Sequence, residues 1–169
     1  MEVLLVDGYN IIGAWPELNR LKQIDLESAR DLLIAKMAEY QAYTGTRVIV
    51  VFDAHLVPGI QQVYSQHDVT VVFTKENETA DEKIEQLVFE LKDSLTQLYV
   101  ATSDYAEQKA IFGQGALRKS ARELLIEMEK VEKNIEQKIE SNYAKPRPSK
   151  IRLTPEIREK FERMRRGLI

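Results

Sequence analysis

Four aspartates at separated positions have the residue type and the placement that divalent-metal chemistry needs. Asp7 follows the apolar run VLLV, Asp53 follows VIVVF, and Asp104 follows LYVATS. Asp81 lies where a helix is expected to begin after another apolar run. Carboxylates gathered within a few ångströms repel one another and raise one another's pKa, so such a cluster needs a cation or a shared proton. We therefore predict that these four aspartates bind a divalent metal ion and carry the catalysis.

The available ligands favour Mg²⁺ or Mn²⁺ over zinc. The chain has no cysteine, and its two histidines, His55 and His67, are not part of a ligand pair, so we assign neither a role. Ligation by oxygen alone suits Mg²⁺ and Mn²⁺. Such ions hold a phosphate oxygen, generate hydroxide from bound water and stabilise a leaving oxygen, and the hydrolysis of a phosphodiester uses all three roles.

Each acid also has a simpler interpretation. A single aspartate after a strand is commonly a turn former or a helix cap. Asp81 alone can favour a helix dipole, and Asp53 can serve the structure or support the metal indirectly. Glu76 and Glu78 are close enough in the sequence to substitute for one of the four. The joint pattern, rather than any single residue, indicates the metal site.

Strands that alternate with helices predict an α/β fold with a mostly parallel sheet covered on both faces. Ligands bind such sheets outside the carboxyl ends of the strands, which would bring the aspartates to one crevice. The segment from Ala54 to Asp68 contains Pro58-Gly59 and few periodic apolar residues, so we expect an irregular loop or a short helix there. The predicted strands are Val3–Val6, Arg47–Phe52, Val69–Phe73 and Leu98–Ala101, and the predicted helices cover Leu26–Tyr43 and Thr79–Asp93.

A long amphipathic helix is predicted from Gly115 to about Ile139, where apolar residues recur at intervals of three and four. Packing on the sheet is favoured over a coiled-coil dimer, because about three heptads barely support a coiled coil, and we expect a monomer. Lys145-Pro-Arg-Pro-Ser then breaks the helix, and Thr154-Pro155 opens a last helix. We thus divide the chain into a main domain, residues 1–144, and a basic linker and C-terminal helix, residues 145–169.

The net charge of −3 hides an asymmetry between these two parts. Residues 145–169 contain nine Lys or Arg and three Glu, a balance of +6, so the remainder carries −9. A basic tail on an acidic body suggests contact with a polyanion, although a solvated tail without a partner gives the same pattern. No apolar run approaches the roughly 18 residues of a membrane span and no signal peptide is recognisable, so we expect a cytoplasmic protein with no membrane partner.

Five motifs taken together resemble a known family. They are VDGYN at 6–10, VVFDAH at 50–55, TKENETADEKIE at 74–85, ATSDYAEQ at 101–108 and IFGQGALRKSAREL at 111–124. The chain resembles the NYN branch of the PIN-like nucleases, and within it the bacterial YacP-type ribonucleases. The similarity spans nearly the whole chain.

This resemblance implies a metal-dependent endoribonuclease with a PIN-like three-layer α/β/α fold and an acidic Mg²⁺ centre. Asp7, Asp81 and Asp104 match the metal-binding acids of the family, and Asp53 in FDAH is expected as a fourth. Asn10 would orient Asp7 or a bound water, while Thr102 and Ser103 would line the site. The relatives are thought to act on mRNA in connection with the ribosome, so single-stranded mRNA and the ribosome are the expected partners, in mRNA decay.

Two further groups of residues are candidates for contact with RNA. Gly113-Gln-Gly115 would precede a helix start that presents Arg118, Lys119 and Arg122 to a phosphate, although a glycine turn with solvated basic residues explains them as well. Single-stranded RNA often stacks on aromatic side chains. Trp15 in the loop after VDGYN is the best candidate for this, with packing as the simpler explanation. Tyr9, Tyr64 and Tyr105 are weaker candidates of the same kind.

Two rival functions remain open from the sequence. A phosphatase-like or receiver-like domain also uses strand-end aspartates and Mg²⁺, but its nucleophile commonly lies in a DxD arrangement, whereas Asp7 is followed by Gly8-Tyr9. A non-catalytic RNA-binding adaptor would keep the fold without the reaction. Phosphomonoester turnover would identify the first rival, and RNA affinity that survives loss of metal without cleavage would identify the second.

Overall fold

A computed structural model of the chain describes residues 1–54, 62–103, 115–144, 159–160 and 163. The chain divides into two compact units, Met1–Lys133 and Asn134–Ile169. In the second unit, Arg163 and Glu159 form an exposed ion pair at 3.5 Å. The predicted boundary after residue 144 stays a prediction, because residues 145–158 lie outside the described ranges. No helix within those ranges is long and apolar enough to cross a bilayer.

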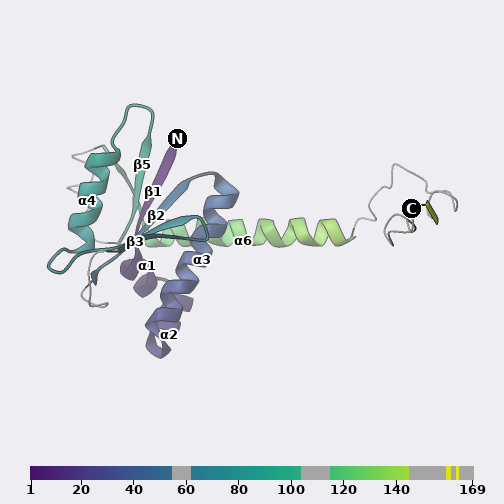
Figure 1. Ribbon diagram of the computed structural model, residues 1–169. Helices are drawn as coiled ribbons and strands as arrows, with labels where there is room; N and C mark the ends of the chain where they lie inside the picture. Colours follow the sequence, from purple (N-terminus) through teal and green to yellow (C-terminus); the bar gives the residue numbers. More distant parts are fainter. Residues whose placement is uncertain (55–61, 104–114, 145–158, 161–162, 164–169) are drawn as a thin grey trace. The chain divides into compact units, whose positions relative to one another are not determined.

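The first unit contains a six-stranded sheet in the order β3-β4-β2-β1-β5-β6 (Figure 1). Every neighbouring pair is parallel except β3 and β4, which are antiparallel. This confirms the predicted α/β class and the mostly parallel sheet. The strands are β1 (Glu2–Asp7), β2 (Arg47–Phe52), β3 (Gln62–Gln66), β4 (Val69–Phe73), β5 (Gln97–Ala101) and β6 (Leu117–Lys119).

Local signals in the sequence set the ends of the helices. Asp25 caps α3 by accepting from the Glu27 backbone N–H at 3.2 Å, and Gly45 ends α3 in the left-handed region at φ 76°, which glycine adopts without a steric penalty. Thr79 caps α4 by accepting from the Glu82 N–H. The helices are α1 (Gly8–Ala14), α2 (Pro16–Ile24), α3 (Leu26–Thr44), α4 (Ala80–Leu91) and α6 (Ala121–Ala144).

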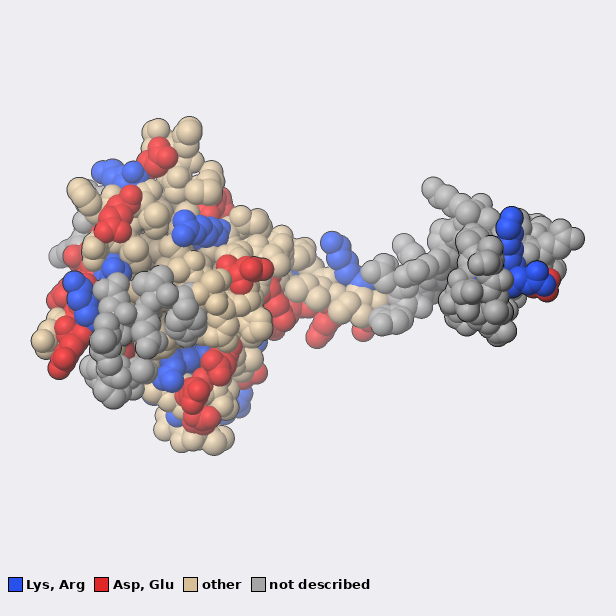
Figure 2. All heavy atoms as spheres, in the orientation of Figure 1, with Lys and Arg blue, Asp and Glu red and all other residues tan. Residues whose placement is uncertain are grey.

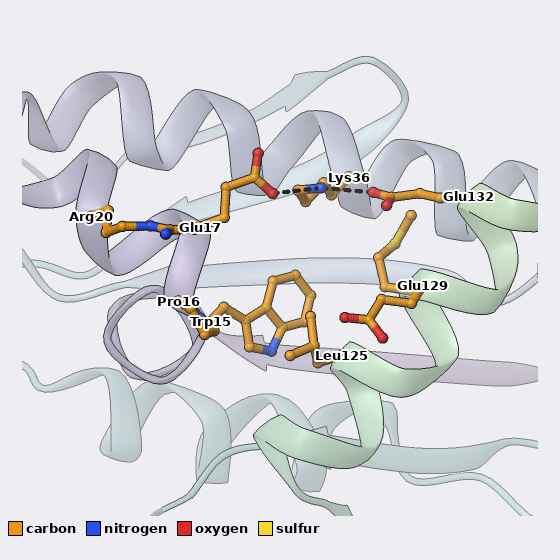
Figure 3. Close-up of a pocket in the computed structure, with 9 residues that line it drawn as sticks. Trp15, Pro16, Glu17, Arg20, Lys36, Leu125, Glu129 and Glu132 are labelled. Atoms are coloured by element: carbon orange, nitrogen blue, oxygen red, sulfur yellow. Dashed lines mark hydrogen bonds and ion pairs between the residues drawn. The ribbon is translucent and has the colours of Figure 1, made fainter.

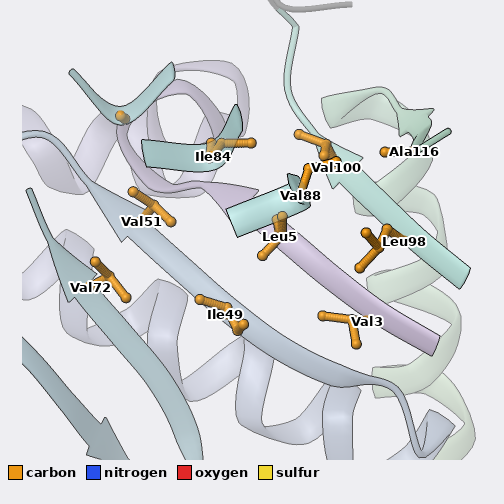
Figure 4. Packing of buried hydrophobic residues seen from close by; sticks show 11 residues of the cluster. Val3, Leu5, Ile49, Val51, Val72, Ile84, Val88, Leu98, Val100 and Ala116 are labelled. Carbon is orange, nitrogen blue, oxygen red and sulfur yellow. The ribbon is translucent and has the colours of Figure 1, made fainter. Parts of the chain in front are cut away.

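The sheet buries an apolar core beneath α4 (Figure 4). Alternate strand residues point to one face, so Val3 and Leu5 of β1 share this face with Ile49 and Val51 of β2, and all four are at most 3% exposed. The other buried members are Val72, Ala80, Ile84, Val88, Leu98, Val100 and Ala116. This core fixes the position of α4, whose first turn carries Asp81.

Helix α6 lies beside α3 through polar contacts in the first unit. The Tyr40 hydroxyl donates to Glu127 at 2.9 Å, and the Lys36 ammonium donates to Glu132 at 2.7 Å. Met128 of α6 is buried, and so are Leu124 and Val131. This part of α6 therefore packs within its own chain, as the favoured alternative predicted, rather than presenting those residues to a second copy.

Two expectations about the elements are wrong, and two helices were missed. The segment expected to be irregular contains β3, which pairs with β4 from Gln62↔Phe73 to Gln66↔Val69. The last long helix begins at Ala121 rather than Gly115, because residues 117–119 form β6 at the sheet edge. Helices α1 and α2 were not predicted. β3 has five residues and β6 has three. An alternation of apolar and polar residues over so short a segment does not reveal an edge strand, which is stabilised by pairing with distant residues.

Candidate active site at the carboxyl edge of the sheet

Asp7 is the last residue of the central strand β1, opposite Val51 of β2. It is 7% exposed and lies at the N-cap of α1, but its side chain makes no capping hydrogen bond. The Thr102 hydroxyl, which is fully buried, donates to Asp7 Oδ2 at 3.5 Å. The structure thus brings Asp7 and Thr102 together from two adjacent strand ends, as the sequence predicts, and the carboxylate is not used to cap the helix.

The two other described aspartates lie at the same edge. Asp53 directly follows β2 and is half-buried. Asp81 is half-buried in the first turn of α4. Helix α4 covers the face of the sheet that carries Leu5, and Asp7, two residues further along β1, is on the same face. Across the residues that the structure describes, no three Asp, Glu or His side chains converge closely enough to hold a metal ion by themselves. Asp104 lies outside the described residues.

Asn10 joins the chain that leaves β1 to the chain that leaves β5. Its side-chain carbonyl accepts from the Ser103 backbone N–H at 2.8 Å and from the Ser103 hydroxyl at 2.7 Å. The structure shows this carbonyl holding Ser103, and the expected role of Asn10 in orienting Asp7 or a water stays a prediction. Because Ser103 immediately precedes Asp104 in the sequence, this pair of hydrogen bonds fixes the point from which that residue departs.

A buried hydroxyl that the sequence analysis overlooked holds the end of β2. Thr74 is fully buried, and its Oγ1 accepts from the Ala54 backbone N–H at 2.9 Å. Its own N–H donates to the Phe52 carbonyl at 3.0 Å. These two bonds hold the chain on both sides of Asp53. The only sequence signal was the position of Thr74 directly after the strand Val69–Phe73.

An aromatic cluster with one arginine lies at the same strand ends. The ring of Tyr9 lies 5.0 Å from that of Phe52, which stacks at 5.3 Å on Phe73. The Arg30 guanidinium donates to the Tyr9 hydroxyl at 3.2 Å and lies 5.9 Å from the Phe73 centroid. Burial raises the pKa of the Tyr9 phenol; Arg30 opposes this, and the Asp53 carboxylate adds to it. Asp53 therefore lies close enough to influence this cluster.

Gly8 allows the cluster to form beside Asp7. A Cβ on Gly8 would come within 2.3 Å of the Phe52 ring, which is much closer than real Cβ contacts. The ring of Phe52 is fully buried, so it cannot easily move away. The glycine of VDGYN is thus required by close packing of α1 on β2.

Trp15 does not have the role we predicted for it. It is 2% exposed, and its indole N–H donates to the Ala121 carbonyl at 2.8 Å. It lies at the base of a pocket of about 230 Å³, which Figure 3 shows between α2, α3 and α6, where Lys36 bridges Glu17 and Glu132. A ring buried in this way joins helices and has no open face for a base.

The three basic candidates after Gly115 have different surroundings. Arg118 is half-buried on β6, and its Nε donates to the Thr102 carbonyl at 3.2 Å, which keeps it near Asp7. Lys119 pairs with Glu127 at 2.9 Å and lies 4.9 Å from the Tyr99 centroid, so it serves internal packing rather than an exposed helix start. Arg122 is exposed on α6. The side chains of Tyr64 and Tyr105 lie outside the described residues.

The sequence and the structure of the chain are similar to those of known proteins. Residues 4–166 match the model of the YacP-like NYN domain. The chain is 60% identical over 167 residues to the uncharacterised protein YacP of Bacillus subtilis (strain 168), covering 99% of this chain and 98% of the relative. The crystal structure of Rae1 (YacP) from Bacillus subtilis is similar with a TM-score of 0.77 at 60% identity, covering 99% of this chain and 96% of that one. A mutant of that protein gives the same TM-score at 58% identity.

Proposed function

This chain belongs to the YacP-like NYN domain family, whose domains are of the nuclease type, and from that premise we propose that it is a metal-dependent endoribonuclease of single-stranded RNA. One observation carries the proposal. The buried carboxylate of Asp7 lies at the end of the central parallel strand, beside the Thr102 hydroxyl. Asp53 and Asp81 lie at the same edge. In parallel α/β sheets this edge is where ligands bind.

The chemistry of the ligands suits Mg²⁺ or Mn²⁺. The three described aspartates provide only carboxylate oxygens, which these ions prefer. Asp7, Asp53 and Asp81 do not converge on one ion by themselves, so in this proposal Asp104 would complete the set of ligands. When bound, such an ion polarises a phosphate oxygen and lowers the pKa of a water molecule.

The residues around the aspartates serve to position them. Asn10 fixes Ser103, and Thr74 fixes the chain on both sides of Asp53. Neutral hydrogen bonds of this kind hold the backbone next to the proposed ligands without adding a positive charge that would compete with a metal ion. The Thr102 hydroxyl donates to Asp7 and so restricts one of its oxygens. Ligands that are fixed before the substrate arrives need little reorganisation during the reaction.

The substrate and partners follow from the same proposal. We infer that the RNA is mRNA in the cytoplasm, that cleavage contributes to mRNA decay, and that the enzyme acts as a monomer that docks on the ribosome. The support for docking on a polyanion is the +6 balance of residues 145–169 against −9 for the remainder. Binding through such a tail releases counterions and weakens steeply with salt. Truncation after Ala144 should therefore reduce both ribosome affinity and its salt dependence, and unchanged values for both would refute the docking.

Cleavage of a long unstructured RNA tests the activity itself. We expect internal cuts with Mg²⁺, no cuts with EDTA, and a large loss in Asp7→Asn, with added ribosomes as a separate condition. Asp31→Asn is the matched control, because Asp31 is an exposed acid of α3. RNA binding without cutting in any condition would replace the nuclease with an RNA-binding adaptor.

A further inference from the structure

We propose that the Arg30 guanidinium, held by the Tyr9 hydroxyl, binds a phosphate of the RNA strand beside the catalytic carboxylates. The inference rests on the proposed ribonuclease function and adds a substrate contact from α3, an element in which the sequence analysis found no functional residue. It is argued from the position, the unused donors and the surroundings of this one side chain.

The position of Arg30 is tied to two strand ends that carry aspartates. Its Nη1 donates to the Tyr9 hydroxyl at 3.2 Å, and Tyr9 follows Asp7 by two residues. Its guanidinium carbon lies 5.9 Å from the Phe73 centroid. Phe73 stacks on Phe52, the residue before Asp53. The aromatic cluster therefore places a cation at the carboxyl edge of β1, β2 and β4.

Among the residues that the structure describes, most donors of Arg30 have no acceptor. A guanidinium has five N–H donors in a planar fork, and the described residues accept one hydrogen bond from it, through Tyr9. Contact with the Phe73 ring uses the face of the guanidinium rather than its N–H groups. Within the described part of the chain Arg30 forms no ion pair, whereas Lys36 and Lys119 pair with glutamates at 2.7 and 2.9 Å. Arg30 can therefore present two parallel N–H groups to one phosphate.

A cation at the acidic edge of the sheet would offset the repulsion between the carboxylates and RNA. Asp7, Asp53 and Asp81 repel a polyanion, and a metal ion offsets only part of that charge. Figure 2 shows acidic and basic side chains interspersed on the visible face of the first unit. This face has no continuous basic patch to attract RNA, so single basic residues have to supply the attraction. Arg30 flanks the edge at β2 and β4, and Arg118 on β6 flanks it beyond β5. A strand of RNA that crosses the edge would meet a guanidinium on each side.

Binding measurements on the full chain test the inference. We would measure the fluorescence anisotropy of a labelled, unstructured 20-nucleotide RNA across a salt series, in an Asp7→Asn background that does not cut. We expect Arg30→Met to raise Kd about tenfold and to reduce the salt slope by about 0.7, the value for one contact to a single strand. Met retains the aliphatic stem over Phe73. Arg30→Lys keeps the charge but not the planar fork of N–H donors, so its Kd should lie between that of the background protein and that of Arg30→Met.

The matched control is Arg47→Met, which removes the same charge from an exposed arginine at the start of β2, the end of the strand away from Asp53. Its Kd and salt slope should stay at the background values. Tyr9→Phe removes the acceptor that holds Arg30 and should raise Kd about threefold. If folded Arg30→Met and Arg30→Lys both bind like Arg47→Met, the inference is wrong although wild-type cleavage still stands. If wild type neither binds nor cuts RNA, the proposed function and this inference fail together.

Discussion

The Asn10 side-chain carbonyl accepts two hydrogen bonds from Ser103, from its N–H at 2.8 Å and from its hydroxyl at 2.7 Å, across 93 positions of sequence. The pair joins the first turns after β1 to the loop after β5. In the sequence, Asp7 lies three residues before Asn10 and Asp104 directly follows Ser103, so the bond joins two segments next to proposed metal ligands. It is a positioning contact rather than a step of the reaction.

Asn10→Ala should therefore lower kcat about 10- to 100-fold, the usual effect of losing a residue that orients metal ligands. The Kd for RNA should change less than threefold, because no phosphate contact is lost. Ser103→Ala removes only the hydroxyl donor and should have the smaller effect. Single-turnover cleavage and anisotropy separate the two quantities, and an Asn10→Ala enzyme with normal kcat would remove Asn10 from the site.

Gly8→Ala should destabilise the fold by about 1–3 kcal/mol, since the added Cβ would lie 2.3 Å from the buried Phe52 ring. Gly13→Ala in the same helix is the matched control, because nothing lies within 4 Å of its Cβ. Alanine should stabilise that position by about 0.5–1 kcal/mol. Urea unfolding measures both free energies. Equal effects at the two positions would show that the close packing of α1 on β2 is not required.

Trp15→Phe should reduce stability and leave cleavage by the folded protein unchanged. The substitution removes the indole N–H that donates to the Ala121 carbonyl at 2.8 Å, and the loss of one such hydrogen bond costs about 0.5–1.5 kcal/mol. The melting temperature and the kcat/KM for RNA provide the two readings. A normal melting temperature with reduced kcat/KM would restore the stacking role that we predicted from the sequence.

Lys36 should contribute pH-dependent stability at the α3–α6 contact. Burial by itself lowers its pKa, but the hydrogen bond and charge of Glu132, with a smaller contribution from Glu17, raise it above 10.5. A raised pKa in the folded state means that the stabilisation is complete below about pH 10.5 and is lost as the pH rises through the folded-state value. Lys36→Met should therefore cost about 1 kcal/mol at pH 7.

The cost of Lys36→Met should shrink above pH 10.5, where wild type also loses the charge. Urea unfolding of both proteins at pH 7 and above pH 10.5 measures this difference. The exposed Lys22 of α2 provides the control, because Lys22→Met removes the same charge without this contact. A constant difference between wild type and Lys36→Met across the range would contradict the role of the ion pair.

The central elements of the fold could be predicted because their sequences carry their own signals. Residues 47–52 form a continuous β-branched run, and the strand occupies those residues. Thr79 and Gly45 mark helix ends by capping chemistry that depends on neighbouring residues only. The aspartates Asp7 and Asp53 could be placed at one edge, because parallel strands end together.

The missed features depend on contacts between distant residues. β6 has three residues and depends on pairing with β5, up to Ala101↔Lys119. Trp15 looks like a loop aromatic until Ala121 is known to lie beside it. In the sequence, Arg30 is one of several charged residues of the helix predicted over 26–43, and only the fold brings it to Tyr9. Periodicity describes which face of an element is buried, but not which distant residue it meets.

Cleavage of a circular single-stranded RNA across a Mg²⁺ titration tests the central claim most directly, because only an endonuclease can open a circle. We predict that wild type and Asp31→Asn cut it with a saturable dependence on Mg²⁺, and that EDTA abolishes the cutting. Asp7→Asn and Asp81→Asn should lose about a hundredfold or more at every Mg²⁺ concentration. Cutting that persists in EDTA, or that is equal in Asp7→Asn and Asp31→Asn, would contradict a metal-dependent site at this edge of the sheet.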